Sequence, residues 1–176
     1  MRTPLQQRLS GGDRKSVGDA LEVAIEVLDT PSLLHEIIDG LRTDDFILRS
    51  RCAHTIASVG FEQPELLESY KAEFLNAFSL IEQWEVREQM SKVIPLLQLD
   101  SREMAQAETI MELYLADRSS IVRTCALQAR FDLLKLDASK SDDVHRLLTE
   151  VQHTGSAAMR ARSRILLTEM DKWPSR

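Results

Sequence analysis

The sequence predicts an all-α protein in which pairs of helices repeat along the chain, and three observations lead to this fold class. Arg49, Arg87, Arg123 and Arg160 recur at intervals of 38, 36 and 37 residues, a period typical of two-helix solenoid repeats. Each arginine follows an aliphatic residue or a methionine and opens an amphipathic segment. Aromatic residues make up only 5% of the chain, which suits helices better than a sheet.

Each repeat is predicted to hold a first helix, a short break and a second helix. In the repeat that contains Arg49, the first helix spans residues 46–59, Gly60 ends it, and Pro64 begins a second helix that reaches about Leu80. Glycine is common just after a helix, and proline is common in its first turn. The same pattern places the other helices at residues 31–41, 84–99, 101–116, 121–136, 141–153 and 157–172.

Local signals refine several of these helices. Pro95 lies inside a predicted first helix, where its missing N–H predicts a kink. Asp100 and Glu103 form a capping-box pattern before one second helix, and Ser141 is predicted to cap another. Trp84 stands at the start of a first helix, and two interpretations stay open for it: a partly exposed anchor for a partner, or packing between repeats.

The domain organisation follows from the repeats. Residues 1–15 are predicted to form a flexible N-terminal arm and residues 16–176 a single repeat domain. A solenoid needs atypical end units to stop stacking, so the repeats are expected at residues 16–43, 44–81, 82–117 and 118–154, with a cap at 155–176. The core is expected to contain Leu48, Ile56, Leu67, Phe74, Val86, Ile94, Ile110, Val122, Leu133, Leu148 and Leu166.

The segments Leu48-Arg49 to Ile56, Pro64 to Leu67 and Tyr70-Lys71 together resemble a HEAT repeat of the small bacterial kind. The resemblance extends over roughly residues 16–172. It implies a right-handed α-α superhelix of about four helical hairpins plus a C-terminal capping helix. It also implies that the first helices form the convex layer and the second helices the concave layer.

The recurrent arginines allow two interpretations. Guanidinium groups in register could contact a phosphodiester backbone, or each could tie its own repeat together by hydrogen bonds to carbonyls or carboxylates. We favour the structural interpretation, because the residue recurs at one internal position. The acidic residue that HEAT repeats carry six positions earlier is present as Asp117 before Arg123 and is displaced or missing in the other repeats.

No sequence pattern predicts a catalytic, cofactor-binding or metal-binding residue. His35-Glu36 resembles the dipeptides of HEAT-like iron hydroxylases, but those enzymes carry such pairs on several repeats and this chain has one. A metal site needs more ligands than one pair supplies, and no helical His-Glu-x-x-His motif occurs. We therefore expect no enzyme activity, no cofactor and no metal.

Composition limits the compartment and the class of partner. No stretch approaches the ~20 apolar residues of a membrane span, and the N-terminus lacks the apolar core of a signal peptide, so a cytoplasmic protein is expected. Cys52 and Cys125 lie in apolar runs and are predicted to be buried thiols in a reducing compartment. The formal net charge of -6 argues against non-specific nucleic-acid binding.

Charge is divided between the two predicted layers. The second helices carry eleven acidic and three basic residues, whereas the first helices are rich in arginine. An acidic groove would attract a basic peptide or protein segment, although the same acids could be an ordinary solvated face. The candidate partner-binding residues are Glu65, Glu68, Glu103, Asp142 and Asp143.

The predicted function is a non-catalytic scaffold or adaptor that binds a protein partner through the solenoid surface. Two alternatives stay open: a nucleic-acid-binding protein related to the HEAT-like alkylpurine DNA glycosylases, and a HEAT-like accessory subunit of an enzyme. Reversal of Glu65, Glu68 and Glu103 to lysine is expected to slow association with the partner at little cost in stability.

Overall fold

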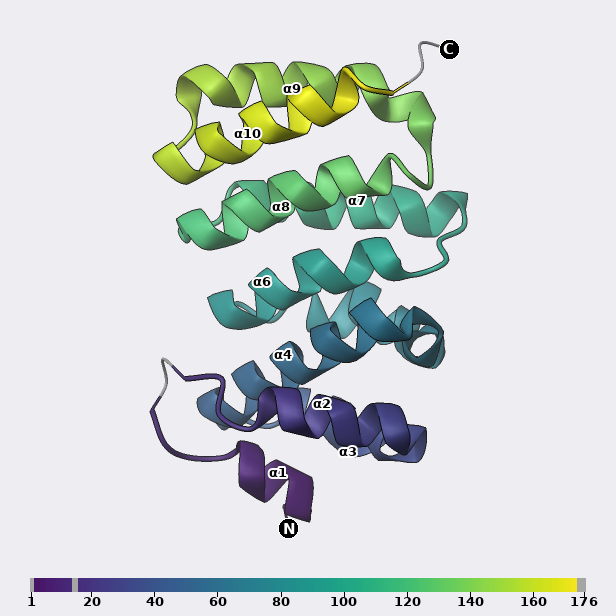
Figure 1. Cartoon of the computed structure of the whole chain (residues 1–176), viewed down its shortest axis with the longest axis vertical. Helices are drawn as coiled ribbons and strands as arrows, with labels where there is room; N and C mark the ends of the chain where they lie inside the picture. The colour runs from purple at the N-terminus through teal and green to yellow at the C-terminus, as the bar shows by residue number, and fades with distance from the viewer. Residues whose placement is uncertain (1, 14–15, 174–176) are drawn as a thin grey trace. The chain divides into compact units, whose positions relative to one another are not determined.

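A computed structural model describes residues 2–13 and 16–173, and all regular structure within those ranges is helical (Figure 1). The predicted all-α class is therefore confirmed. The chain divides into two compact units, Met1–Gln98 (unit 1) and Leu99–Arg176 (unit 2), where the sequence predicts one domain after residue 15. Within the described ranges, no helix has both the length and the apolar character to cross a membrane.

The central helix of unit 1 is α4 (Phe46–Glu62). It contacts α2 (Ala20–Asp29), α3 (Leu34–Leu41) and α6 (Trp84–Val93). A short 3-10 turn over Pro31–Leu33 leads into α3, so proline begins this helical segment as predicted. The short helix over Pro4–Leu9 and the 3-10 helix over Pro64–Tyr70 also contact α4, so α4 supports the surfaces described below.

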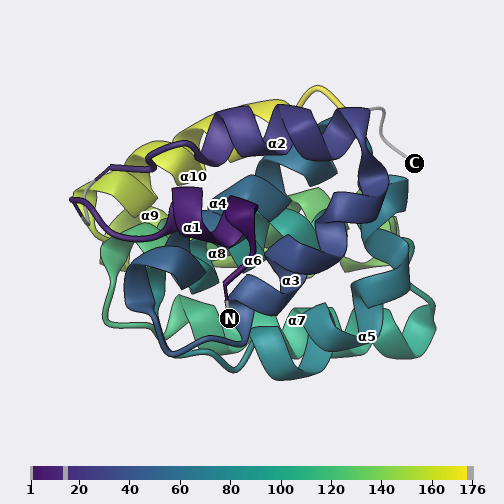
Figure 2. The ribbon, with the colours of Figure 1, turned by 90° about the horizontal axis from the view of Figure 1, so that it is seen from below.

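The N-terminal segment contains a docked helix, which corrects the flexible arm predicted for residues 1–15. α1 (Pro4–Leu9) contacts α3 and α4 (Figure 2) and buries Leu5 and Leu9. Thr3 and Gln6 form a capping box at its start. A helix of six residues is too short to show helical periodicity in the sequence. Residues 1, 14 and 15 of the predicted arm lie outside the described residues.

α4 begins at Phe46, as predicted, but continues past the predicted end at residue 59. Asp45 fixes the start, because its carboxylate accepts hydrogen bonds from two backbone N–H groups of the first turn, both at 2.9 Å. These backbone bonds are the main reason that the pKa of Asp45 is lowered. Gly60 lies inside the helix, and a Cβ there would stand 2.6 Å from Cδ1 of Leu67. This glycine therefore permits close packing and does not end the helix.

A second glycine sets the contact between α3 and α4. Gly40 is buried, and a Cβ at this position would overlap the sulfur of Cys52. Cys52 is fully buried as predicted, and burial raises the pKa of its thiol to about 12. Cys125 in unit 2 is half-buried, which is less than predicted.

The segment that follows α4 is irregular, although the sequence predicts one α-helix over residues 64–80. Pro64–Tyr70 form a 3-10 helix, α5 (Lys71–Glu73) is one short α-helical stretch, and Phe74–Phe78 form a π-helix. Leu67, Phe74, Leu75 and Phe78 are buried as expected, whereas Tyr70 is half-buried. The buried face is thus kept while the hydrogen-bond pattern changes along it.

Pro95 ends a helix and does not kink one. α6 ends at Val93, and a 3-10 turn over Ile94–Leu96 carries the proline near its start. Proline has no N–H to donate within a continuing α-helix, so the α-helical pattern stops before it.

Unit 2 begins with the predicted capping box. Oδ1 of Asp100 accepts a hydrogen bond from the backbone N–H of Glu103 at 2.8 Å, and the backbone N–H of Asp100 donates to Oε2 of Glu103 at 2.9 Å. Ser141 is the first residue of its helix and not the N-cap, because a 3-10 turn over Ala138–Lys140 leads directly into it. The helices of this unit are α7 (Ser101–Leu115), α8 (Ser120–Leu133), α9 (Ser141–Thr154) and α10 (Ala157–Met170).

The cores of both units match the sequence prediction. All eleven predicted core residues are buried, and none is more than 7% exposed. In unit 2, α8 contacts α7 and α10, and α9 contacts α10. Phe131 belongs to the apolar cluster between these helices, and its ring lies 5.4 Å from that of Trp173.

Candidate functional site

Two of the recurrent arginines make the same contact with their own chain. Nε of Arg49 donates a hydrogen bond to the carbonyl oxygen of Thr43 at 2.9 Å, and Nε of Arg87 donates to the carbonyl oxygen of Ile81 at 3.1 Å. Each acceptor stands six residues before its arginine. These guanidinium groups therefore bond to the turn that precedes α4 or α6.

The other two recurrent arginines differ in detail. Nη1 of Arg160 donates to the carbonyl oxygen of Gly155, five residues earlier, at 2.8 Å. Nε of Arg123 is buried without a hydrogen-bond partner among the described atoms. Three of the four arginines thus direct donors to a nearby carbonyl.

The five acidic residues predicted to bind a partner are divided between the units. Glu65 and Glu68 lie in unit 1, and Glu103, Asp142 and Asp143 lie in unit 2. Glu65 and the two aspartates are exposed, whereas Glu68 and Glu103 are half-buried. Within unit 2, the two aspartates share the first turn of α9.

Two of these acids have structural roles. Oε1 of Glu68 accepts a hydrogen bond from the backbone N–H of Gln98 at 2.7 Å, and Glu103 belongs to the capping box of α7. Loss of either carboxylate removes a partner of a backbone N–H group. We therefore correct the expectation that reversing these charges costs little stability: at Glu68 and Glu103 it should cost more.

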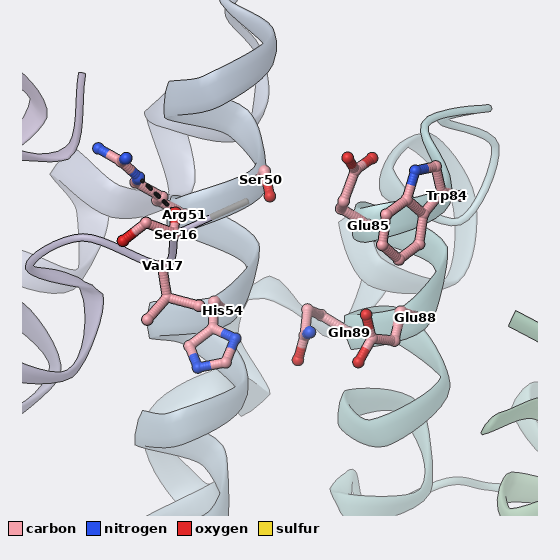
Figure 3. A pocket seen from close by; sticks show the side chains of 9 residues that line it. All are labelled: Ser16, Val17, Ser50, Arg51, His54, Trp84, Glu85, Glu88 and Gln89. Carbon is pink, nitrogen blue, oxygen red and sulfur yellow. Dashed lines mark hydrogen bonds between the residues drawn. The ribbon is translucent and has the colours of Figure 1, made fainter. Parts of the chain in front are cut away.

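A cleft of about 550 Å³ lies in unit 1 between α4 and α6 (Figure 3). Figure 3 shows His54 on the α4 side, and the side chains of Glu85, Glu88 and Gln89 on the α6 side. The indole of Trp84 stands next to Glu85. Among these residues, Glu85 and Gln89 are at least nine-tenths buried, whereas Trp84, Glu88 and His54 are half-buried.

The charges near the cleft are partly balanced. Nζ of Lys92 donates to Oε1 of Glu88 at 2.8 Å and to Oε1 of Gln89 at 3.2 Å. The pKa of His54 is lowered, first by burial and then by the positive charge of Lys92. This imidazole is therefore neutral at pH 7, and it brings no positive charge to the cleft.

Arg51 also borders the cleft, but its guanidinium is directed to the N-terminal segment. It donates to the carbonyl oxygens of Leu9 at 3.2 Å, Asp13 at 3.1 Å and Ser16 at 3.2 Å. Gly18 has a φ of 55°, and a Cβ there would stand 2.8 Å from Cζ of Arg51. Figure 3 shows the guanidinium pointing away from α6. Arg51 thus holds the chain that leads into α2.

An exposed apolar stripe adjoins the cleft. Val17, Leu21 and Ile25 are 41%, 51% and 60% exposed. Leu21 and Ile25 are four residues apart in α2 and therefore lie on one face of it, whereas Val17 lies just before the helix. We call these three residues the α2 stripe. Because Val17 also lines the cleft, the stripe and the cleft form one continuous surface.

The structure does not place His35 and Glu36, the pair considered as metal ligands, in a group of ligands. His35 is exposed, and its Nδ1 lies 2.5 Å from the carbonyl oxygen of Ser32. Within the part of the chain that the structure describes, no group of three or more histidine, cysteine, aspartate or glutamate side chains could hold a metal ion.

The sequence interpretation missed the cleft and the α2 stripe. Part of the signal was available, because α2 carries apolar residues on a buried face, Val23 and Val27, and again at positions 21 and 25. An isolated amphipathic helix has one apolar face, so a second one indicates a further contact. The cleft itself depends on how α4 and α6 pair, which no local pattern shows.

Comparison with known proteins adds no assignment to this geometry: no family model, no curated protein and no solved structure matches the chain.

Proposed function

We propose that the protein is a non-catalytic scaffold or adaptor that binds a segment of a partner protein across the α2 stripe and the adjoining cleft. The observation that carries the proposal is the α2 stripe, where three large apolar side chains are exposed on α2 and just before it. A contiguous exposed apolar patch is costly in water and commonly marks a protein interaction site. The cleft next to it adds polar groups for specificity.

The proposal includes a HEAT-like repeat architecture with a right-handed α-α superhelix. Two observations support it within unit 1. Consecutive first helices touch, since α4 contacts both α2 and α6. Arg49 and Arg87 stand at equivalent positions and each bonds to a carbonyl six residues earlier. Stacked hairpins of this kind supply a rigid surface for a partner.

A protein partner accounts for this surface better than a nucleic acid does. The guanidinium groups of Arg49, Arg51 and Arg87 donate to backbone carbonyls of the chain itself, and the cleft is lined by Glu85 and Glu88. A phosphate backbone needs available cations. In this proposal the protein works in the cytoplasm, where its free cysteines stay reduced.

The test compares the wild type with the double variant Leu21→Ser, Ile25→Ser. The matched control is Leu80→Ser, because Leu80 is 66% exposed in the same unit but lies outside the stripe. Proteins captured from a lysate by each form are identified by mass spectrometry, and the purified candidate is then titrated against each form by calorimetry. We expect the double variant to weaken binding about tenfold or more, while the control binds like the wild type.

Three results would overturn the proposal. Equal binding of the candidate by all three forms would show that the stripe is not the docking surface. Self-association that the double variant abolishes would assign the stripe to a second copy of this chain. Tight duplex DNA or RNA binding that falls steeply with salt would favour the nucleic-acid alternative.

A further inference from the structure

We infer that two copies of the chain associate through the outer face of α10, with the two helices antiparallel about a two-fold axis. The contact uses none of the residues of the α2 stripe, so the inference goes beyond the proposed function. We call Ala157, Ala161, Ile165 and Thr168 the α10 face. Their spacing of four, four and three places them along one side of the helix.

The α10 face is exposed, while the other side of the same helix is packed. Met159, Ser163 and Leu166 are buried, because α10 contacts α8 and α9 (Figure 1). Ile165 is 49% exposed, and the other three residues of the α10 face are exposed as well. An aliphatic side chain flanked by small ones therefore faces solvent in a single chain.

The equivalent positions in α4 and α8 face a neighbouring helix. The fifth residue after the recurrent arginine is His54 in α4, Gln128 in α8 and Ile165 in α10. His54 borders the cleft toward α6, and Oε1 of Gln128 accepts a hydrogen bond from Nη1 of Arg162 in α10 at 3.3 Å. This position meets another helix in both cases, and in α10 it carries an aliphatic side chain that suits the same kind of contact.

The size of the side chains on the α10 face suits two closely packed helices. Alanine and threonine are small, so the axes of two such helices can approach to about 8 Å. α10 has 14 residues and is therefore about 20 Å long, which is short for a protein–protein interface. We expect a weak, reversible dimer with a Kd of about 10–100 µM.

The charges beside the α10 face match those of a second, antiparallel copy. Arg162 and Glu169 are equally far from the midpoint between residues 165 and 166, and so are Arg160 and Asp171. All four side chains are exposed, and each pair is separated by close to a whole number of helical turns, so its members lie on one side of α10. A two-fold axis at the midpoint therefore places each arginine opposite an acidic residue of the second copy. A parallel pair would place like charges opposite one another.

The experiment measures the mass of the full chain by sedimentation equilibrium from about 1 µM to about 1 mM. We expect the mass to rise from 20.0 kDa toward twice that value as the concentration increases. Ile165→Asp should weaken dimerisation at least tenfold, because it brings two like charges together near the two-fold axis. The matched control is Ile121→Asp, since Ile121 is also 49% exposed in unit 2 but lies in α8. This control should dimerise like the wild type.

A mixing experiment tests the antiparallel arrangement. Arg162→Glu alone and Glu169→Arg alone each place like charges opposite one another, so each should weaken dimerisation about tenfold at low salt. An equimolar mixture of the two variants places opposite charges at both contacts and should dimerise like the wild type. Circular dichroism of each variant checks that its helices are intact.

The inference fails on any of three results. A chain that stays at 20.0 kDa up to millimolar concentration makes no such contact. A dimer that persists in Ile165→Asp, or that Ile121→Asp also abolishes, does not form through the α10 face. A mixture that dimerises as weakly as its components contradicts the antiparallel pairing. The double variant of the α2 stripe should dimerise like the wild type, so partner binding at the stripe and dimerisation at α10 can fail separately.

Discussion

The first and last segments of the chain are held in place by different chemistry. In unit 1, α1 buries Leu5 and Leu9, and the chain from Leu9 to α2 is held by Arg51, which donates to the backbone carbonyls of Leu9, Asp13 and Ser16. In unit 2, α10 and the residues after it are held by an apolar cluster that includes Phe131 and Trp173. Contacts between apolar side chains are visible in the sequence as periodicity. Hydrogen bonds to backbone carbonyls are not visible in it, because every residue carries a backbone carbonyl. The C-terminal helix was therefore predicted, whereas the N-terminal segment, with a helix too short to show periodicity and a chain held through carbonyls, was taken for a flexible arm.

The largest loss of stability should follow disruption of the apolar cluster that holds α10. Phe131→Ala should lower the free energy of unfolding of unit 2 by about 3–5 kcal/mol, because it removes a fully buried ring and leaves a cavity. Urea unfolding followed by circular dichroism measures this loss. Leu136→Ala is the control in the same unit, since Leu136 is 48% exposed. A loss as small as that of the control would mean that α10 is held by something other than the cluster.

Loss of the hydrogen bonds from Arg51 in unit 1 should lower stability nearly as much. Arg51→Met keeps an apolar stem but removes three donors, and the carbonyl of Leu9 then loses a buried hydrogen bond. We expect a loss of about 2–3 kcal/mol in unfolding free energy and faster proteolysis between residues 9 and 20. Arg102→Met, at an exposed position, should change neither quantity. Unchanged proteolysis in the Arg51 variant would show that α1 alone holds the segment.

Substituting two glycines can distinguish the cost of backbone strain from the cost of contact with Arg51. Gly11 and Gly18 both have positive φ, at 69° and 55°, but a Cβ at Gly11 meets nothing within 4 Å, whereas one at Gly18 meets Arg51. Gly11→Ala should cost about 1 kcal/mol from strain alone, and Gly18→Ala should cost about 1–2 kcal/mol more, because it also displaces the guanidinium. Thermal unfolding of the pair gives the difference directly. Equal losses would argue against close packing on Arg51.

Unit 2 also contains polar contacts that stabilise it. Loss of the capping box of α7 should lower its stability least. Glu103→Lys should cost about 1 kcal/mol, because it removes the acceptor for the backbone N–H of Asp100 and places a positive charge in the first turn of α7. Glu65→Lys should cost less, since the side chain of Glu65 is exposed. Urea unfolding of both variants tests this order, and the reverse order would contradict the structural role given to Glu103.

The sequence predicted burial correctly where one face of a helix packs against the core. The predicted core residues are buried because their spacing of three and four fixes which side of each helix faces inward. It was a poor guide to the irregular segment Pro64–Phe78, because 3-10, α and π patterns place apolar side chains on similar faces. Of the candidate site, only Trp84 was noted in advance, since the cleft depends on the pairing of α4 with α6.

The fit between Gly40 and Cys52 has a consequence for how this sequence can vary. The space that a Cβ at position 40 would need is filled by the sulfur at position 52, so the two positions share one small volume. A chain with alanine at 40 should therefore carry alanine or glycine at 52, and a chain with valine or leucine at 52 should retain glycine at 40. Among homologous chains the two positions should change together, which makes this pair a marker for the α3 and α4 hairpin in sequences that otherwise share little with this one.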